Sequence, residues 1–277
     1  MKVSIIIAVY NEAATVGMLL ERVLAQPLPQ AAGREIIIIE SNSTDGSREI
    51  VAEFAARHSG AGPSRIQVIY QDRPHGKGHA VREGLAAASG DIVLIQDADL
   101  EYDVADYPAL LEPLVEGRAA FVLGSRHAGP GHWAIRQFAH NGVLALLLNV
   151  GGMMFRVLFN ALFHCRLADP TTMYKVFRAE CLEGLSFSCD RFDFDFELLA
   201  KVIRAGFTPL EVPVSYRSRS FDEGKKIRIV RDGIRGVFAI LRFGLTIPRQ
   251  KRRAPGATPA PRVHTDTLGA PRWSTRK

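Results

Sequence analysis

Short apolar runs alternate along the first half of the chain with segments whose apolar residues recur at helical spacing. The runs predict five strands, at residues 2–10, 35–39, 66–70, 91–96 and 119–124. The helically spaced segments predict three helices between the first four strands, at residues 13–26, 47–58 and 78–89. Several of the strands are continuously apolar, which is typical of a parallel sheet covered by helices on both faces. The pattern therefore predicts an α/β fold.

Every polar cluster in this half follows a predicted strand. The clusters are YNE at 10–12, ESNSTDG at 40–46, QDRPHGKG at 71–78 and DADLE at 97–101. Ligands of parallel sheets bind beyond the carboxyl ends of the strands, so we expect these four loops to share one crevice. The GKG at 76–78 lacks the glycine and the Ser or Thr of a Walker loop, and no GxGxxG follows the first strand. A dinucleotide or ATP site is therefore not indicated.

Three carboxylates, Asp97, Asp99 and Glu101, stand at every second position directly after a buried run. If the backbone stays extended there, all three side chains lie on one side of it. Carboxylate oxygens suit Mg²⁺ or Mn²⁺, and Mg²⁺ is usually held by one or two carboxylates together with substrate phosphates. The spacing favours a metal and diphosphate site, and a polar turn after a strand is the alternative.

Composition describes a folded chain with a separate basic end. Of the 277 residues, 47% are hydrophobic and 23% are charged, which permits one large domain or two. The net charge of +6 is concentrated in residues 249–277, which are rich in Pro, Gly and Arg. We predict that this tail is disordered and solubilising, with attraction to anionic lipid as a second role and nucleic acid as a distant third.

The cysteines and the apolar runs indicate where in the cell the protein is expected to act. Cys165, Cys181 and Cys189 show no CxxC spacing, so neither a disulfide framework nor a zinc site is indicated, and a reducing, cytosolic setting is expected. The N-terminal apolar run ends without a cleavage site, so no signal peptide is predicted. The run 143–163 is interrupted by Asn, Gly and Arg, which predicts an amphipathic pair of helices in a membrane interface rather than a span. Two core helices are the alternative.

Eight segments resemble a known family in the same order along the chain. AVYNE at 8–12, SNSTDGS at 41–47, GKGHAVREGL at 76–85 and DADLE at 97–101 resemble the nucleotide-sugar half of the family 2 glycosyltransferases. The later segments resemble the branch that contains dolichyl-phosphate mannose synthase and related polyprenyl-phosphate sugar transferases. These are GSR at 124–126, DPTTMYKVFR at 169–178, FDFDFELLAK at 192–201 and VSYRSRSFDEGKKI at 214–227.

The resemblance, which covers residues 1 to about 245, implies an A-type glycosyltransferase fold: a Rossmann-like, mostly parallel sheet with helices on both faces, plus acceptor-side helices. It implies a catalytic domain at 1–248, with a nucleotide-sugar half at 1–125 and an acceptor half with amphipathic helices at 126–248.

On the donor side, the resemblance implies that the loop after the first strand holds the base and ribose, and that Lys77 meets a phosphate. The implied nucleotide-sugar-binding residues are Ala8, Tyr10, Glu12, Glu40, Ser41, Lys77, Asp97, Ala98 and Asp99. The implied ligands for Mg²⁺ or Mn²⁺ are Asp97, Asp99 and Glu101, the last standing where the mannose synthases carry Gln. Glu40 and Ser41 replace the Asp-Asp of the family, which leaves open the choice between uridine and guanosine. Asp45 is expected to cap the following helix rather than to contact a ligand.

On the acceptor side, an isoprenyl monophosphate is largely ionised near neutral pH, with a second pKa of about 6, so it needs cations rather than a protein base. The candidate cations are Arg126, Arg136, Arg217, Arg219, Lys225 and Lys226. Asp169 stands where hydroxyl-accepting relatives place a general base, so Asp97, Asp99, Arg126 and Asp169 form the candidate catalytic set. Glu197 is expected to face inward more than Asp193 or Asp195, and Tyr174 and Phe177 are expected in the core.

These expectations converge on one function. We expect inverting, metal-dependent transfer of a sugar, with GDP-mannose as the first donor, to a polyprenyl or dolichyl phosphate. The enzyme would be cytoplasmic and peripheral at the inner face of the membrane. Residues 133–163 and the basic stretch 225–253 would contact the lipid. No nucleic-acid partner is expected. The alternatives are transfer to a hydroxyl acceptor with Asp169 as the base, and a non-catalytic binding protein at the membrane surface.

Overall fold

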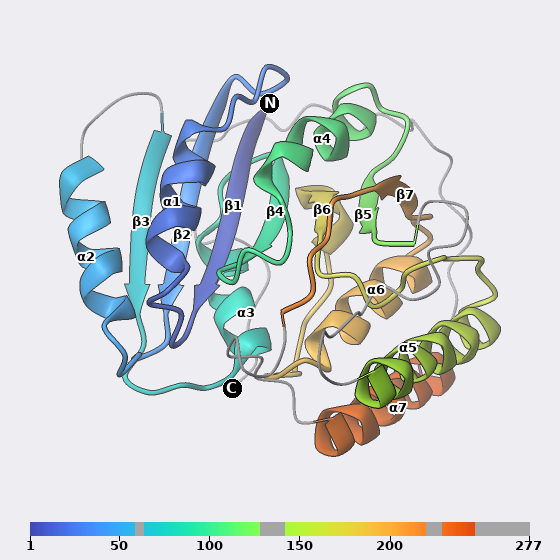
Figure 1. The fold of residues 1–277 in the computed structure, drawn as a ribbon. Helices are drawn as coiled ribbons and strands as arrows, with labels where there is room; N and C mark the ends of the chain where they lie inside the picture. The colour runs from blue at the N-terminus through green and yellow to red at the C-terminus, as the bar shows by residue number, and fades with distance from the viewer. Residues whose placement is uncertain (59–63, 128–141, 220–228, 247–277) are drawn as a thin grey trace.

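The computed structural model describes residues 1–58, 64–127, 142–219 and 229–246 (Figure 1). Arg136, Lys225, Lys226 and the predicted tail at 249–277 lie outside the described residues. The predictions made for them stay predictions, as does the division of the chain at residues 125 and 248.

One seven-stranded sheet crosses both halves of the molecule, with the strand order β3-β2-β1-β4-β6-β5-β7. All neighbouring strands are parallel except at β6, which runs antiparallel to both β4 and β5. The strands are β1 (Lys2–Val9), β2 (Gly33–Glu40), β3 (Ser64–Tyr70), β4 (Ile92–Asp97), β5 (Phe121–Ser125), β6 (Lys175–Arg178) and β7 (Leu210–Pro213). This confirms the predicted α/β fold with a mostly parallel sheet.

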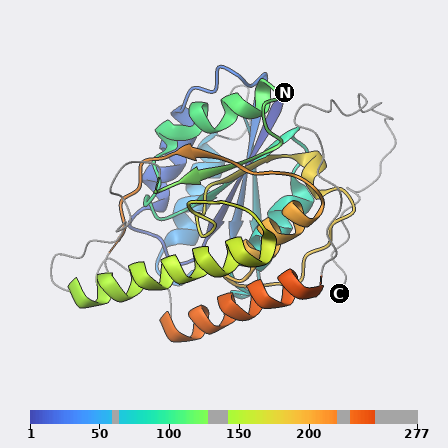
Figure 2. The same ribbon diagram turned by 90° about the vertical axis from the view of Figure 1, so that its right-hand side faces the viewer.

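Helices cover both faces of the sheet. One face carries α1 (Val16–Ala25), α2 (Ser47–His58) and α4 (Tyr107–Val115), the last preceded by the short helix η1 (Val104–Asp106). The other face carries α3 (Lys77–Ala87) and α6 (Phe194–Arg204), and the short helix η2 (Ala179–Leu182) follows β6. Two long helices, α5 (Gly142–Phe163) and α7 (Ile229–Thr246), lie side by side next to α6 (Figures 1 and 2).

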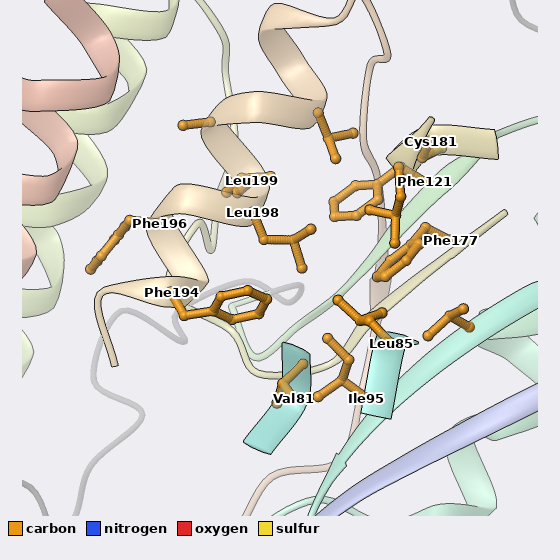
Figure 3. Packing of buried hydrophobic residues seen from close by; sticks show 14 of the residues in the cluster. Val81, Leu85, Ile95, Phe121, Phe177, Cys181, Phe194, Phe196, Leu198 and Leu199 are labelled. Carbon is orange, nitrogen blue, oxygen red and sulfur yellow. The ribbon is translucent and has the colours of Figure 1, made fainter. Parts of the chain in front are cut away.

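The continuous apolar runs are explained by two hydrophobic cores, one on each face. In β2, Ile37 and Ile39 point into the core under α3 and α6, whereas Ile36 and Ile38 point into the core under α1, α2 and α4. All four are fully buried, and each contributes about 1.5–3 kcal/mol of burial free energy. Figure 3 shows the core under α3 and α6, where Phe194 and Leu198 of α6 point toward Phe121 and Phe177 of the sheet.

The apolar run at 143–163 forms one continuous helix, α5, and the predicted pair of helices is wrong. A helical glycine costs about 1 kcal/mol, so Gly151 and Gly152 weaken the helix without ending it while its inner face packs on the body. Phe159 and Phe163 are buried on that face. By length and composition α5 could cross a bilayer, a property that core helices of soluble proteins share. Lipid contact therefore stays a prediction.

Three smaller expectations of burial are confirmed. Tyr174 and Phe177 are fully buried, Tyr174 next to the start of β6 and Phe177 within it. Glu197 is also fully buried in α6, and its carboxylate accepts hydrogen bonds from the backbone nitrogens of Ser188 and Cys189 at 3.0 and 2.8 Å. Glu197 therefore fixes the loop before α6.

Candidate active site

The carboxyl ends of six strands meet at one edge of the sheet. Because β4 and β5 are both antiparallel to β6, they point the same way, and Asp97 and Ser125 end at the same edge. The same arrangement makes β6 begin there, so the segment 169–174 enters the edge from the acceptor half. Residues from both halves are thereby brought to one place, as the predicted crevice requires.

The loops after β1 and β2 are tied to each other. The backbone nitrogen of Asn11 donates to Ser43 Oγ at 3.0 Å, and the nitrogen of Thr44 donates to Asn11 Oδ1 at 2.9 Å. The nitrogen of Glu12 donates to Ser47 Oγ at 2.7 Å. Asn11 has a φ of 51°, a left-handed conformation that asparagine tolerates better than most residues. The expected base and ribose region is thus preformed by hydrogen bonds.

Asp45 holds the start of α2, as expected. Its carboxylate accepts from the backbone nitrogen of Ser47 at 3.0 Å and from Ser47 Oγ at 2.6 Å, at the first residue of the helix. It also accepts from the nitrogen of Ala13 at 3.0 Å. These hydrogen bonds outweigh the effect of burial and lower the pKa of Asp45.

Glu40, at the end of β2, is committed to its own loop. The fully buried carboxylate accepts from the backbone nitrogens of Ser43 and Asn42 at 2.7 and 3.2 Å, and from Arg48 Nη1 at 3.2 Å. Ser41 is buried beside it, and its nitrogen donates to the carbonyl of Val9 at 2.9 Å. Glu40 braces the loop, so its expected contact with a base would compete with these bonds.

Gln71, after β3, is a residue that the sequence analysis missed. Its backbone nitrogen donates to the carbonyl of Glu40 at 2.8 Å, and its side-chain Nε2 donates to Glu83 Oε2 at 2.8 Å. The Glu83 carboxylate thereby fixes the amide orientation. Gln71 Oε1 is buried with no hydrogen-bond partner among the described residues, which is costly for a buried acceptor. Its position after a parallel strand was the signal in the sequence.

The other nucleotide-side residues lie around the end of β1. Ala8 is half-buried and pairs in register with Asp97, and Tyr10 is exposed. Ala98 is buried, and its carbonyl accepts from Thr15 Oγ1 at 2.8 Å. The Ala98 side chain packs in the core, and its carbonyl ties the turn after β4 to Thr15.

Lys77 and Asp97 form an ion pair across the predicted site. Lys77 Nζ donates to Asp97 Oδ1 and lies 3.3 Å from the Met173 sulfur. Burial disfavours the charged ammonium, but the carboxylates Asp97 and Asp195 raise the pKa of Lys77 on balance. Gly76 and Gly78 let the start of α3 approach the loop before α6 closely, since a Cβ at these positions would overlap the Asp190 carbonyl and Phe194. The ion pair itself holds a positive charge beside Asp97.

Asp99 lies in a cluster of acids. Arg219 Nη2 is 2.9 Å from Asp99 Oδ2, and the same guanidinium donates to Glu12 at 2.8 and 3.2 Å. Burial raises the pKa of Asp99 to about 7, with the charges of Asp97 and Glu101 adding to the effect and Arg219 opposing it. Among the described residues, the charge of this carboxylate is therefore incompletely compensated.

The expectation that Asp97, Asp99 and Glu101 share one side of an extended backbone is wrong. Strand β4 ends at Asp97, and Leu100 has a φ of 57°, which turns the chain. Glu101 instead accepts from Tyr216 OH at 2.7 Å and from the nitrogen of Arg219 at 2.9 Å. In the part of the chain that the structure describes, no three His, Cys, Asp or Glu side chains gather closely enough to hold a metal ion. The metal roles stay predictions.

Arg126 and Asp169 form a buried, bidentate ion pair. Arg126 Nε and Nη2 lie 2.7 Å from the two carboxylate oxygens, and the Arg126 nitrogen donates to Asp169 at 3.0 Å. The side chains are 5% and 1% exposed. Burial alone would raise the pKa of Asp169, yet the Arg126 guanidinium holds it well below its usual range. Arg126, predicted to bind the acceptor phosphate, and Asp169, predicted as a candidate base, therefore form one ion-paired unit.

Two further residues hold this unit and were missed. Glu211 of β7 accepts from the backbone nitrogens of Ala168 and Asp169, both at 2.7 Å. Lys175, fully buried at the start of β6, donates to the carbonyl of Thr172 and lies 3.3 Å from Asp195 Oδ1. Neither residue shows a periodic signal in the sequence. The predicted Arg217 is exposed, and its nitrogen donates to the carbonyl of Glu101 at 2.8 Å.

The sheet and its edge agree with what comparisons with known proteins find. The model of the family described as glycosyl transferase family 2 matches residues 4–185, more than half of the chain. The chain belongs to glycosyl transferase family 2, and it is a glycosyltransferase. This membership replaces the alternative of a non-catalytic binding protein.

Curated relatives extend the match beyond the family model. A dolichol-phosphate mannosyltransferase of Pyrococcus furiosus is 27% identical over 252 residues, which are 90% of this chain and 66% of the relative. An undecaprenyl-phosphate 4-deoxy-4-formamido-L-arabinose transferase of Photorhabdus laumondii is 25% identical over 81% of this chain and 62% of its own length. The chain thus spans less than two thirds of both relatives. An uncharacterised glycosyltransferase of Mycobacterium bovis is 32% identical over 76% of this chain and 85% of its length.

Solved structures confirm the A-type glycosyltransferase fold. Glucosyl-3-phosphoglycerate synthase of Mycobacterium tuberculosis, in complex with Mn²⁺, UDP and phosphoglyceric acid, superposes with a TM-score of 0.61. It is 23% identical, over 90% of this chain and 80% of the other. A complex of the same enzyme with Mg²⁺ and UDP gives a TM-score of 0.57 at 21% identity, over 90% and 81%. At this identity the likeness is one of fold.

Proposed function

We propose that this glycosyltransferase moves a sugar from a nucleoside-diphosphate sugar to a polyprenyl phosphate, with inversion and with Mg²⁺ or Mn²⁺ as cofactor. The observation that carries the acceptor class is the buried Arg126–Asp169 pair. A general base works best with a pKa near the working pH, and the pKa of Asp169 is well below its usual range. A phosphate monoester supplies its own anionic oxygen, so it needs no such base.

The curated relatives support the same acceptor class. One is named for transfer to dolichol phosphate and another for transfer to undecaprenyl phosphate. Both acceptors are lipid phosphates, although the sugars differ. The shared feature is therefore the acceptor chemistry, and we infer it for this chain.

On the donor side, the residues present fit a divalent cation. Asp97 and Asp99 offer hard carboxylate oxygens, and two carboxylates with substrate phosphates are the usual protein contribution to Mg²⁺. A bound cation would offset the charge that develops on the departing nucleoside diphosphate. Lys77, whose pKa is raised, adds a fixed positive charge beside Asp97 for the same phosphates.

The donor base is the finest part of the proposal. GDP-mannose is the first donor to test, because the P. furiosus relative is named a mannosyltransferase. Gln71 Oε1 is the acceptor we assign to a base N–H, which guanine offers at N1 and uracil at N3, because Glu83 fixes the amide orientation and Oε1 has no hydrogen-bond partner among the described residues. Glu40 is occupied by its own loop, so it does not replace the family's second aspartate.

On the acceptor side, we assign the lipid phosphate to the cations at this edge. Arg219 and Arg126 are held in place by carboxylates, and Arg217 is exposed. A charge-assisted hydrogen bond to phosphate contributes about 1.5–3 kcal/mol, so each such cation would offset part of the repulsion between donor and acceptor phosphates. Arg136, Lys225 and Lys226 keep their predicted roles.

Helices α5 and α7 supply the proposed membrane contact, at the inner face of the membrane. Their outer sides expose large apolar residues: Val157 is 64% exposed and Leu147 61% on α5, and Phe238 is 66% exposed on α7. The helices lie side by side in both views (Figures 1 and 2), so the residues belong to one layer of the molecule. A lipid interface would bury these side chains, each with about 1.5–3 kcal/mol, and would bring a lipid-linked phosphate to the enzyme.

The decisive experiment offers the full chain Mn²⁺, a panel of labelled nucleotide sugars, and either a polyprenyl phosphate or the corresponding polyprenol. We expect label in the phosphate-linked lipid alone. Asp169→Asn should leave part of this transfer intact, because no proton has to be removed. Transfer to the free hydroxyl, with a loss of about 10²–10⁴-fold in Asp169→Asn, would instead establish the alternative in which Asp169 is the base.

A further inference from the structure

The segment 214–219, which leaves β7 and is called the clasp segment here, runs along the turn that follows β4. The nitrogen of Arg217 donates to the carbonyl of Glu101 at 2.8 Å, and Tyr216 forms an isolated antiparallel bridge with Tyr102. The nitrogen of Arg219 continues this pairing by donating to Glu101 Oε1 at 2.9 Å. Residues 216, 217 and 219 of the clasp segment are therefore bonded to Glu101 and Tyr102 in the turn after β4.

The carboxylate of Glu101 is occupied by this segment. One oxygen accepts from Tyr216 OH at 2.7 Å and the other from the Arg219 nitrogen, and the side chain is only 11% exposed. The Tyr216 ring is further held between Tyr102, with ring centroids 5.0 Å apart, and the guanidinium of Arg126, which lies 5.1 Å from the ring centroid. Each Glu101 oxygen thus already accepts a hydrogen bond from the clasp segment, and a cation bound there would share the carboxylate with that segment.

Beyond this anchor, the Arg219 guanidinium reaches the donor carboxylates. It donates to both oxygens of Glu12, at 2.8 and 3.2 Å, and to Asp99 Oδ2 at 2.9 Å. Glu12 belongs to the loop after β1 and Asp99 to the turn after β4, so one side chain from the acceptor half bridges two donor loops. Its charge therefore lies among three carboxylates, those of Glu12, Asp99 and Glu101.

We propose that Glu101 is a positioning residue rather than a metal ligand. It fixes Arg219 against Asp99 and Glu12, so that Arg219 and a divalent cation compete for Asp99. The proposal rests on the proposed function for the metal role of Asp97 and Asp99, and it adds that binding of the cation is coupled to the clasp segment. A carboxylate stands at 101 because it accepts two hydrogen bonds, where a neutral amide would accept at one oxygen only.

Mn²⁺ affinity of the full chain, measured by titration without nucleotide, separates positioning from ligation. Glu101→Leu removes both oxygens. If Glu101 is a ligand, the affinity falls by more than about tenfold, because lost ligand or orienting contacts cost about 10–100-fold. If it is a positioning residue, the affinity stays within about threefold of the wild type or rises, since Arg219 is released from Asp99. A loss beyond tenfold overturns the proposal.

Arg219→Gln provides the second arm, because it removes the competitor. We expect Mn²⁺ affinity to rise about tenfold, the equivalent of one charge-assisted contact. In this background Glu101→Leu should have no further effect, since Glu101 acts through Arg219. Arg118→Gln, which removes an exposed arginine far from the site, is the matched control and should leave the affinity unchanged. Equal losses from Glu101→Leu in both backgrounds would contradict the proposal.

Two more variants keep the test decisive. Tyr216→Phe removes the hydroxyl that donates to Glu101 and keeps the ring, so it loosens the clasp segment even if Glu101→Leu fails to fold. A rise or no change in affinity supports positioning, and a fall beyond about tenfold marks Tyr216 as the orienting partner of a ligand. Asp99→Asn should weaken Mn²⁺ binding. An unchanged Mn²⁺ affinity in Asp99→Asn would overturn the metal role of Asp99 in the proposed function. A loss of affinity in both Asp99→Asn and Glu101→Leu would leave that role standing and overturn only the proposal that Glu101 is a positioning residue.

Discussion

Two carboxylates at opposite edges of the same sheet, the buried Glu35 and the half-buried Asp99, have opposite electrostatic environments. Glu35 lies near the amino end of β2, where it accepts from Lys2 Nζ and Ser4 Oγ, both at 2.5 Å, and from the nitrogen of Ser89 at 2.6 Å. Burial opposes its ionisation, but these hydrogen bonds lower the pKa of Glu35 to about 2. Asp99 lies past the carboxyl end of β4, where burial and the neighbouring acids raise the pKa to about 7.

The difference separates a carboxylate that serves the fold from one that serves a ligand. Around Glu35 the chain supplies a cation, hydroxyls and a backbone donor, so the charge is satisfied internally. Around Asp99 the carboxylates Glu12, Asp97 and Glu101 lie close together, and among the described residues Arg219 contacts three of these four acids. Carboxylates whose pKa is strongly raised by burial and neighbouring acids are typical of binding and catalytic sites.

The largest effect should come from neutralising the acids Asp97 and Asp99 at the carboxyl ends of the strands. Asp97→Asn and Asp99→Asn should each lower the rate of sugar transfer with Mn²⁺ by about 10³-fold, because compensation of the leaving diphosphate is lost. The measurement is the initial rate of label transfer to polyprenyl phosphate. Glu35→Gln is the matched control at the amino edge, and its rate per folded molecule should equal that of the wild type. A comparable loss in Glu35→Gln would erase the distinction between the two edges.

A smaller effect, on stability, should come from the amino edge. Glu35→Gln places an amide where the Lys2 ammonium and the Ser89 nitrogen both donate, leaving one part-buried donor without an acceptor. We expect the free energy of unfolding to fall by about 2 kcal/mol, measured by urea denaturation. In a chain of this size, the loss corresponds to a decrease in Tm of about 4–8 °C. An unchanged urea midpoint would mean that the Glu35 network contributes nothing net.

The third effect concerns the pH dependence of stability, and it has opposite signs at the two edges. The folded pKa of Glu35 is depressed to about 2, so its stabilising contribution is complete above about pH 4.5 and is lost as pH falls toward 2. The folded pKa of Asp99 is raised to about 7, so its contribution is complete below about pH 4 and is lost as pH rises through 7.

Urea midpoints measured with a chelator present should show both signs. The difference between wild type and Glu35→Gln should shrink below about pH 4.5, and Asp99→Asn should gain stability relative to the wild type between about pH 4 and 8. A gain in stability on losing a functional carboxylate is the usual trade-off at active sites. Parallel pH curves for the wild type and Asp99→Asn would show that Asp99 is not perturbed.

The first half of the fold could be predicted because its signals are local. The apolar runs of β1 to β4 predict strands without any knowledge of which strands pair. The predicted helix at 47–58 has the same bounds as α2. By contrast β6 and β7 have four residues each, too few for a period, and the insertion of β6 is decided by pairing with β4 across more than seventy residues. The residues of the candidate site also fall into those predictable from local sequence and those set by contacts between distant residues.

Asp97 and Asp99 reach the predicted edge because a strand end fixes them. The pairing of Arg126 with Asp169, the hold of Glu211 on that segment and the occupied carboxylate of Glu101 depend on contacts between distant residues. The left-handed Leu100 is a further limit, since no sequence rule assigns such a conformation to leucine, which tolerates it poorly. Local pattern thus located the site, and tertiary contacts determined which side chains are available in it.

The antiparallel strand β6 also sets an order of assembly during synthesis. It lies between β4 and β5, so neither of those strands can complete its pairing until residues 175–178 have left the ribosome. Until then β4 presents a bare edge of unpaired backbone groups, the kind of surface on which nascent chains associate wrongly. The nucleotide half of the enzyme can therefore form early, whereas the half that meets the acceptor exists only after β6 has closed the gap between them.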